Sequence, residues 1–311
     1  MSADTVYVGI DIAKATLAVR LLSRDLDYPN TAAGHAELAA ALRATGRPVH
    51  VTCEATGGYE RALVLALHTA GIALSVVNPR QVRDYARARG LLSKTDRIDA
   101  AVLADYGECL RPAMTAAATP AQRELAGLVS ARQALVELIG AEKGRAEHLE
   151  LPLLRRQHQA RLRQLEKQRT ALDRLIARRI DADALLAAKS ARLQQVDGVG
   201  PVLAMTVLAL MPELGTLRDP QAAALAGVAP FARDSGPYKG QRHISGGRAC
   251  VRRVLYMAAL SACTHNRILA EYYRHLLARG KLPLVALTAV MRKLILLLNR
   301  LLADPTFVLA H

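Results

Sequence analysis

The sequence predicts an α/β plus all-α fold, with an α/β domain at the N-terminal end, then a long helical segment, then an all-helical C-terminal region. Three observations predict this organisation. Short β-rich runs alternate with helical patterns over residues 5–111. Leucines at helical spacing extend over residues 120–190, and further apolar helical runs fill residues 193–311. The 311 residues are enough for two or three domains with a sizeable core.

The first region, residues 1–113, opens with two β-rich runs, VYVGIDIA and ATLAVRLL, close enough in sequence to form a hairpin. We expect a helix over residues 35–43, a strand in PVHVTCEA, and a helix over residues 59–70. ALSVVNP is a further strand ending at Pro79, and residues 95–110 again have a helical pattern. Two antiparallel strands followed by strand–helix units are the order of a ribonuclease-H-like sheet. Periodicity alone predicts only the α/β class.

The second region, residues 120–190, has two amphipathic helical patterns. In the first, Leu125, Leu128, Leu135, Leu138 and Ile139 fall on one helix face. A second series extends over residues 162–180, and the proline at position 152 separates the two. We predict a helical hairpin or coiled-coil arm that serves as a spacer or an oligomerisation element.

The third region, residues 193–311, contains the segment Val196–Pro201 between two apolar helical runs. Glycines at positions 198 and 200 allow a tight turn and let backbone N–H groups approach a phosphate. This pattern predicts a helix-hairpin-helix, and the alternative is an ordinary turn between two helices.

The charge of the chain favours nucleic acid as a partner. Lys and Arg total 42 against 27 acidic residues, giving a formal charge of +15. This excess is spread along the chain, which favours nucleic acid over a membrane surface. The first residues lack the pattern of a signal peptide, and no Cys-x-x-Cys pair is present. We therefore expect a cytoplasmic protein without a membrane span, associated with the nucleoid when bound to DNA.

Four acids form the candidate metal site. Asp11 and Glu54 each close a predicted strand, whereas Asp96 and Asp99 lie three residues apart at the start of a predicted helix. Side chains at strand ends and at helix starts lie close together in an α/β sheet. Four clustered carboxylates repel one another unless a cation such as Mg²⁺ binds them. One or two Mg²⁺ ions can support phosphodiester chemistry. Each acid has an alternative. Asp11 is also compatible with an actin-like sugar kinase, Glu54 with a surface position, and Asp96 and Asp99 with simple first-turn acids.

The motifs GIDIAK, CEATGGYE, VVNP and KTDRIDA resemble the N-terminal half of IS110-family insertion-sequence transposases. VDGVGPVLA, LAGVAPFARDSGPYKG, HISGGRACVRRVLYMAA and AVMRKL resemble the C-terminal half. The resemblance covers nearly the whole chain. It implies a RuvC-like domain with Asp11, Glu54, Asp96 and Asp99 as the metal-binding acids, and a C-terminal transposase domain with Ser235 as the nucleophile. It also implies DNA as substrate, a structured bridge RNA as guide, and a homo-oligomer, a dimer or tetramer.

Ser235 lies in a predicted exposed turn among cationic residues. Without the resemblance, a turn serine in a basic nucleic-acid-binding loop is the better interpretation, and Ser245 is a rival nucleophile. Ser245 precedes two glycines and a helix, a setting typical of an N-cap or a phosphate contact. One departure from the family is that no Lys or Arg follows Ser245. Tyr238 and Tyr256 are candidates for stacking on bases, with core packing the alternative for Tyr256. The predicted nucleic-acid contacts are Arg233, Lys239, Arg242, His243, Ser245, Arg248, Arg252 and Arg253.

The sequence thus predicts a DNA recombinase that excises and inserts an insertion sequence through a covalent serine–DNA intermediate. Two alternatives stay open. One is a metal-dependent junction-resolving nuclease in which Ser235 is structural, and the other is a non-catalytic nucleic-acid-binding protein.

Overall fold

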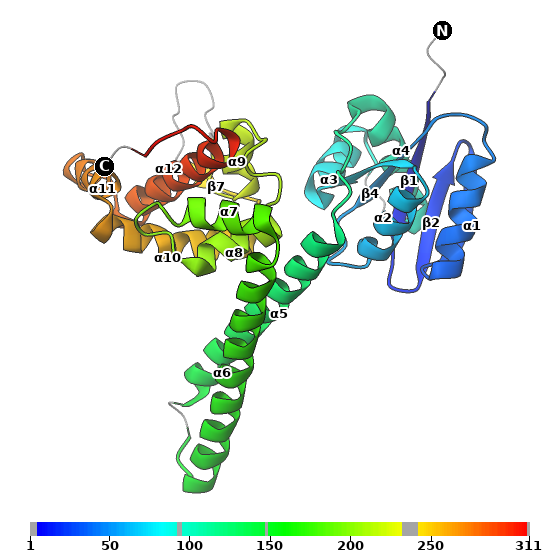
Figure 1. Ribbon diagram of the computed structural model, residues 1–311. Helices are drawn as coiled ribbons and strands as arrows, with labels where there is room; N and C mark the ends of the chain where they lie inside the picture. Colours follow the sequence, from blue (N-terminus) through cyan, green and yellow to red (C-terminus); the bar gives the residue numbers. More distant parts are fainter. Residues whose placement is uncertain (1–4, 92–94, 147–148, 232–241, 310–311) are drawn as a thin grey trace. The chain divides into compact units, whose positions relative to one another are not determined.

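The computed structural model describes residues 5–91, 95–146, 149–231 and 242–309. The chain divides into two compact units, residues 1–118 and 119–311 (Figure 1). The first boundary lies close to the expected one. The second unit contains both the predicted arm and the C-terminal helices, and their division into separate domains stays a prediction.

The first unit is built on a five-stranded mixed sheet with the order β3-β2-β1-β4-β5. β1 (Val6–Ile12), β2 (Thr16–Leu21) and β3 (Arg24–Pro29) are antiparallel neighbours, whereas β4 (Val49–Glu54) and β5 (Ala73–Val77) run parallel to β1. This order is consistent with the ribonuclease-H-like sheet that the sequence predicted. β3 was not predicted, because three of its six residues are charged and it lies at the edge of the sheet.

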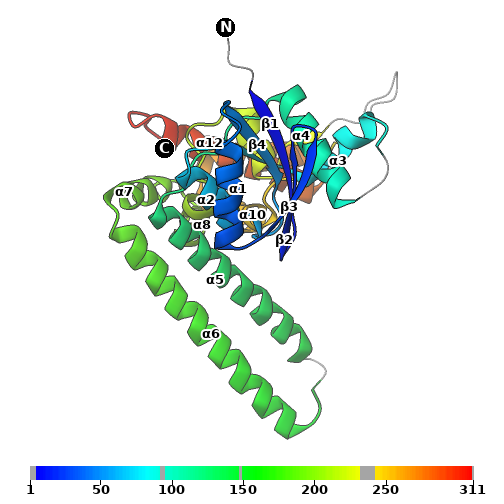
Figure 2. The ribbon, with the colours of Figure 1, turned by 90° about the vertical axis from the view of Figure 1, so that its right-hand side faces the viewer.

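Helices cover both faces of this sheet (Figure 2). α1 (Ala32–Arg43) and α2 (Glu60–Thr69) bury leucines against one face, which is formed by Val6, Val8, Ile10 and Ile12 of β1 and their neighbours. α3 (Pro79–Ala88) and α4 (Asp96–Leu110) pack on the other face through a smaller apolar cluster that includes Val77 and Leu103. The alternation along β1 therefore places Gly9 and Asp11 on the α4 face.

The second unit begins with two long helices, α5 (Pro120–Arg145) and α6 (Pro152–Asp181), which lie side by side in both ribbon views (Figures 1 and 2). Their apolar seam is thin. Leu125 and Ile139 are buried as expected, but Leu138 is 52% exposed and does not belong to it. Ion pairs between the two helices supplement the seam: Arg132–Asp173, Lys143–Glu166, Arg161–Glu142 and Arg179–Glu124. Whether the helices form a true coiled coil stays a prediction.

The remaining helices enclose a continuous apolar core. They are α7 (Ala184–Leu193), α8 (Pro201–Leu210), α9 (Asp219–Leu225), α10 (Ala249–His265), α11 (Arg267–Ala278) and α12 (Pro283–Ala303). α12 supplies the largest share of this core, because seven of its buried residues belong to it.

The C-terminal region is not purely helical, contrary to the prediction. β6 (Pro230–Phe231) and β7 (His243–Ile244) form a short antiparallel pair. Among the described helices, none combines the length and apolar character needed to cross a membrane.

Candidate active site

α4 lies directly on the sheet because two glycines leave room for it. A Cβ atom on Gly9 of β1 would lie 1.9 Å from the carbonyl oxygen of Ala100, and one on Gly107 would lie 2.3 Å from Oγ1 of Thr52. Both distances are far below any real contact, so a side chain at either position would push the helix away. The backbone of α4 is thereby held against β1 and β4.

Asp11 and Glu54 end adjacent parallel strands on this same face. β1 and β4 pair with Ile10 opposite Cys53, so the next residues along, Asp11 and Glu54, are neighbours. Side chains alternate along a strand, and both acids therefore project toward the face that α4 covers. Both are half-buried.

Asp96 and Asp99 belong to the first turn of α4, which begins after the N-cap residue Thr95. The side chain of Thr95 accepts a hydrogen bond of 3.3 Å from the backbone N–H of Ile98. First-turn acids are favoured by the helix dipole alone, as the alternative interpretation stated. All four acids line one pocket of about 420 Å³. Their role as metal ligands stays a prediction.

The loop after Glu54 is held in place by a carboxylate of α2. Oε2 of Glu60 accepts hydrogen bonds from the backbone N–H of Thr56, from its hydroxyl and from the N–H of Gly58, at 3.1, 3.0 and 2.8 Å. Burial alone would raise the pKa of Glu60, but backbone donors at Glu60 and Gly58 and both donors of Thr56 lower it below its ordinary value. The CEATGGYE motif thus fixes the backbone next to Glu54.

The donor set suits a hard divalent cation, because carboxylate oxygens are the ligands that Mg²⁺ prefers. The four side chains do not converge on one point, however. Among the described residues, no group of three or more His, Cys, Asp or Glu side chains is arranged to hold a metal ion. The chemistry of the pocket therefore fits a metal, while the side-chain geometry shown is not that of a loaded site.

Two arginines of α3 complete the lining of this pocket, and the sequence prediction missed them. Arg80 and Arg83 line it together with Pro79, Val82, Ala86 and Val102. A start signal for α3 was present, because the side chain of Asn78 caps the helix at the N–H of Arg80 and Pro79 occupies the first turn. Cations beside carboxylates give the pocket both the ligands for a metal and a counter-charge for phosphate.

Ser235, Arg233 and Lys239 lie outside the described residues. The described residues that precede and follow residues 232–241 form β6 and β7, in which Phe231 pairs with His243 and Pro230 with Ile244. Residues 231 and 243 are therefore held side by side. Arg242 and His243 are exposed, as expected for residues that contact a ligand.

Beside β7, two glycine-containing loops cross in close contact. A Cβ atom on Gly247 would lie 2.2 Å from the backbone nitrogen of Gly227, and both residues have positive φ. Nη1 of Arg252 donates to the carbonyl oxygens of Gly246 at 2.7 Å and Gly227 at 3.4 Å, which ties the loops together. Ser245 is half-buried and is not the N-cap of α10, contrary to one expectation, because Gly246 and Gly247 intervene and Arg248 occupies that position.

Comparison with known proteins decides the family. A family model described as "Transposase", for the DEDD transposases of the IS110 group, matches residues 8–151. A second, described as "Transposase IS116/IS110/IS902 family", matches residues 190–274. Two relatives, the pilin gene-inverting proteins of Moraxella lacunata and Moraxella bovis, are each 25% identical over 300 residues, covering 93% of both chains.

The chain belongs to the IS110 family of transposases. It is accordingly a DNA recombinase of the transposase class, as the sequence predicted. The DEDD match spans the strands and the helix that carry all four acids, so the pocket of the first unit belongs to the matched domain.

In this transposase the arginines predicted to contact phosphate already have partners. Arg248 makes two hydrogen bonds to the carboxylate of Glu213, at 2.8 and 2.7 Å, and Arg253 pairs with Glu137 of α5. Arg252 holds the two crossing loops. These contacts give each of the three arginines a structural role. The predicted contacts of these arginines with phosphate stay predictions, and a phosphate would have to compete with the present partners.

The predicted helix-hairpin-helix corresponds to α7, α8 and the turn between them. Gly198 in this turn has φ of +96°, and a Cβ atom there would lie 2.6 Å from the backbone of Ala262 in α10. The close approach of this turn to α10 is therefore a sufficient reason for a glycine at position 198, without any contact to phosphate. Gly200 has no such contact, since nothing lies within 4 Å of its Cβ position. A phosphate-binding function of the turn stays a prediction.

Proposed function

We propose that this transposase excises and inserts an insertion sequence by cutting DNA through a covalent serine intermediate, with the acidic pocket as its metal site. The observation that carries the proposal is the placement of Asp11, Glu54, Asp96 and Asp99 around one pocket in a member of this family. The relatives are named for inverting a pilin gene, and inversion needs the same cutting and rejoining of strands.

The DEDD family suggests dependence on a divalent metal, and we propose Mg²⁺. The four carboxylates would hold one or two ions, and Mg²⁺ bound there supplies polarisation of a phosphodiester. Arg80 and Arg83 line the same pocket and would orient the phosphate through charge-assisted hydrogen bonds. α4, held against the sheet at Gly9 and Gly107, keeps Asp96 and Asp99 in register with the strand ends.

The proposed nucleophile is Ser235. Its hydroxyl loses a proton as the Oγ–phosphorus bond forms, and the bond from phosphorus to one deoxyribose oxygen breaks. That oxygen takes up a proton and leaves as a hydroxyl. Attack by a deoxyribose hydroxyl on the phosphoserine reverses these steps and rejoins a strand, so no external energy source is needed. Arg242 and His243 follow closely in sequence and would offset charge that develops on the phosphate.

We further propose that a structured guide RNA from the element supplies sequence recognition and that a dimer or tetramer is the active form. The chain carries a charge of +15, yet the described residues contain no zinc site and no separate base-reading domain is apparent. Phosphate-binding charge alone gives no sequence specificity, and base pairing by a guide strand supplies it. Sequencing the RNA that remains bound after a high-salt wash tests this: one species encoded beside the gene is expected, and a random pool would contradict it.

The central experiment compares strand cleavage and adduct formation in matched variants. Asp11→Asn, Glu54→Gln, Asp96→Asn and Asp99→Asn should each abolish cleavage, because an amide binds Mg²⁺ poorly. Glu108→Gln is the control, since Glu108 is exposed on α4 outside the pocket. Ser235→Ala should eliminate the covalent adduct, and Ser245→Ala should only weaken it.

The outcomes separate the proposal from its alternatives. Metal-dependent cleavage that persists in Ser235→Ala without any adduct indicates a junction-resolving nuclease. A labelled peptide containing Ser245 instead of Ser235 overturns the assignment of the nucleophile. Nucleic-acid binding without cleavage in the wild type, under conditions where the RNA is present, contradicts the proposed cleavage chemistry.

A further inference from the structure

A pocket of about 930 Å³ opens in the second unit, at the upper limit of the roughly 300–1,000 Å³ typical of ligand sites. Its walls come from the β6–β7 pair and from α10, α11 and α12. Pro230, His243 and Ile244 of the strand pair belong to its lining. The pocket therefore lies beside the two strands that precede and follow residues 232–241.

The walls are mainly apolar and aromatic, and several of these side chains are open to solvent. Met257 of α10 is 62% exposed, and Leu284 and Val285 in the first turn of α12 are 64% and 53% exposed. Tyr256 and Tyr272 are half-buried, so that each packs partly on the core and partly lines the pocket. Contiguous exposed apolar surface of this kind marks a binding site.

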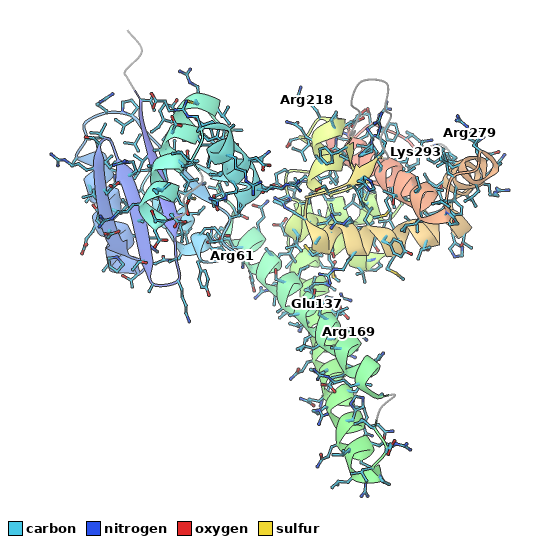
Figure 3. All side chains as sticks on the ribbon, turned by 180° about the vertical axis from the view of Figure 1, so that it is seen from behind. Arg61, Glu137, Arg169, Arg218, Arg279 and Lys293 are labelled. Carbon is cyan, nitrogen blue, oxygen red and sulfur yellow. The ribbon has the colours of Figure 1, made fainter. Side chains whose placement is uncertain are left out.

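Basic side chains line the pocket, and no acidic residue is among the described lining residues. The basic side chains are those of Arg242, His243, Arg252, Arg253, Arg292 and Lys293. Nζ of Lys293, labelled in Figure 3, lies 4.0 Å from the centre of the Tyr272 ring. A lining with several basic side chains and no acidic one among its described residues favours an anionic ligand.

We propose that this pocket binds a single unstacked nucleotide of the nucleic acid on which the transposase acts. Tyr256, Met257 and Tyr272 would contact the base. Basic side chains of the lining other than the already paired Arg252 and Arg253, such as Lys293, would contact its phosphates. Aromatic faces flanked by cations are the combination that binds single-stranded nucleic acid, because every base presents a π-face and every nucleotide carries a phosphate. The inference rests on the proposed function for the identity of the ligand, and it names a subsite that the recombination chemistry does not itself require.

A second copy of the chain fits this surface less well. A partner protein would have to bring an acidic, apolar segment to a cationic rim, whereas the chain as a whole carries a charge of +15. An unstacked base held in the pocket would fix the position of the neighbouring phosphodiester relative to β6 and β7.

The test uses the full-length protein and a hairpin duplex carrying one bulged 2-aminopurine nucleotide, prepared as DNA and as RNA. A second pair of hairpins carries an abasic bulge at the same place. The wild type should bind at least one base-containing hairpin about tenfold more tightly than its abasic form, and stacking on tyrosine should quench 2-aminopurine fluorescence. Whether the DNA hairpins or the RNA hairpins show this difference identifies the ligand as DNA or RNA.

Met257→Glu and Leu260→Glu form a matched pair of variants on α10. Both residues are exposed and both variants add one negative charge, but only Met257 lines the pocket. Met257→Glu should remove the preference for the base and the quenching, while Leu260→Glu keeps both. Tyr272→Leu keeps the apolar bulk and should reduce the preference several-fold. Thermal melting of each variant verifies the fold.

Equal affinity of the wild type for base and abasic hairpins of both kinds overturns the proposal, as does an equal effect of the two glutamate variants. A change in oligomeric mass by light scattering in Met257→Glu alone would show that a second copy occupies the pocket. Strand cleavage is measured in parallel. Cleavage without base preference refutes the pocket only, whereas base preference without cleavage refutes the proposed function only.

Discussion

The acids of the first unit lie on regular secondary structure, whereas the described candidate residues of the second unit lie on and around a two-residue strand and in the first turns of α10. Asp11, Glu54, Asp96 and Asp99 occupy strand ends and a helix start whose separation is set by strand pairing and by the contact of α4 with Gly9. In the second unit, β6 and β7 are two residues long and are held by a crossing of glycine loops and by Arg252. The first arrangement is set by strand pairing and by the packing of a helix on the sheet. The second depends on a few close contacts between loops.

Breaking the contact between α4 and the sheet should have the largest effect. In Gly9→Ala the new Cβ atom would lie 1.9 Å from the backbone of α4, which cannot move without leaving the sheet. We expect a loss of roughly 3 kcal/mol of stability in the first unit, together with loss of cleavage. Urea denaturation measures the loss of stability, and hydrogen exchange of the backbone amides shows which part of the protein has lost it.

Gly127→Ala is the control, because nothing lies within 4 Å of its Cβ position in α5, and alanine should stabilise that helix by about 0.5–1 kcal/mol. Unchanged exchange protection of α4 in Gly9→Ala would contradict the close packing.

Breaking the contact between the two crossing loops should lower the stability of the protein by a smaller amount. Gly247→Ala combines a positive φ with a contact of 2.2 Å to the backbone of Gly227, for an expected loss of about 2–3 kcal/mol. Its neighbour Gly246 has a similar φ but nothing within 4 Å, so Gly246→Ala should lose only the roughly 1 kcal/mol of backbone strain. The midpoints of thermal unfolding measure the difference, and equal midpoints would mean that the crossing contributes nothing.

The difference between the two units also explains how much could be predicted. Asp11, Glu54, Asp96 and Asp99 could be grouped from the sequence because β-rich runs and helix starts have recognisable patterns, and strand ends lie close to helix starts in an α/β sheet. Gly9 and Gly107 gave no signal, because a close approach between distant segments is visible only in three dimensions. Arg80 and Arg83 were missed although Asn78–Pro79 is a helix start signal. In the second unit the crossing of Gly227 and Gly247 and the pairing of Arg248 with Glu213 are long-range contacts that no local pattern encodes.

The turn between α7 and α8 offers a sharper test within the second unit. Gly198→Ala should lower stability by about 2 kcal/mol through its contact with Ala262, with or without nucleic acid. Gly200→Ala should leave stability nearly unchanged, because its φ of −96° suits alanine and its Cβ position is open. A helix-hairpin-helix that binds phosphate through its backbone predicts weaker binding of non-specific duplex DNA in Gly200→Ala. Unchanged affinity in a fluorescence titration would favour an ordinary turn.

The smallest expected effect concerns two carboxylates, one in each unit. Glu60 is held by backbone and hydroxyl donors, and Glu213 by Arg248. Burial alone would raise the pKa of Glu213, but the hydrogen bonds and charge of Arg248 lower it, and the pKa of Glu60 is lowered as well. A lowered pKa in the folded state stabilises the protein above the ordinary value of 4.5, and this stabilisation disappears as the pH falls through the folded-state pKa. Glu60→Gln and Glu213→Gln should therefore each lower the melting temperature at pH 7 by a few degrees and flatten its decline below pH 4.5.

Salt distinguishes the two carboxylates, because it screens the partly exposed Glu213–Arg248 pair more than the neutral donors around Glu60. At 1 M salt the effect of Glu213→Gln should shrink while that of Glu60→Gln persists, and equal shrinkage would show that the two units hold their carboxylates in the same way.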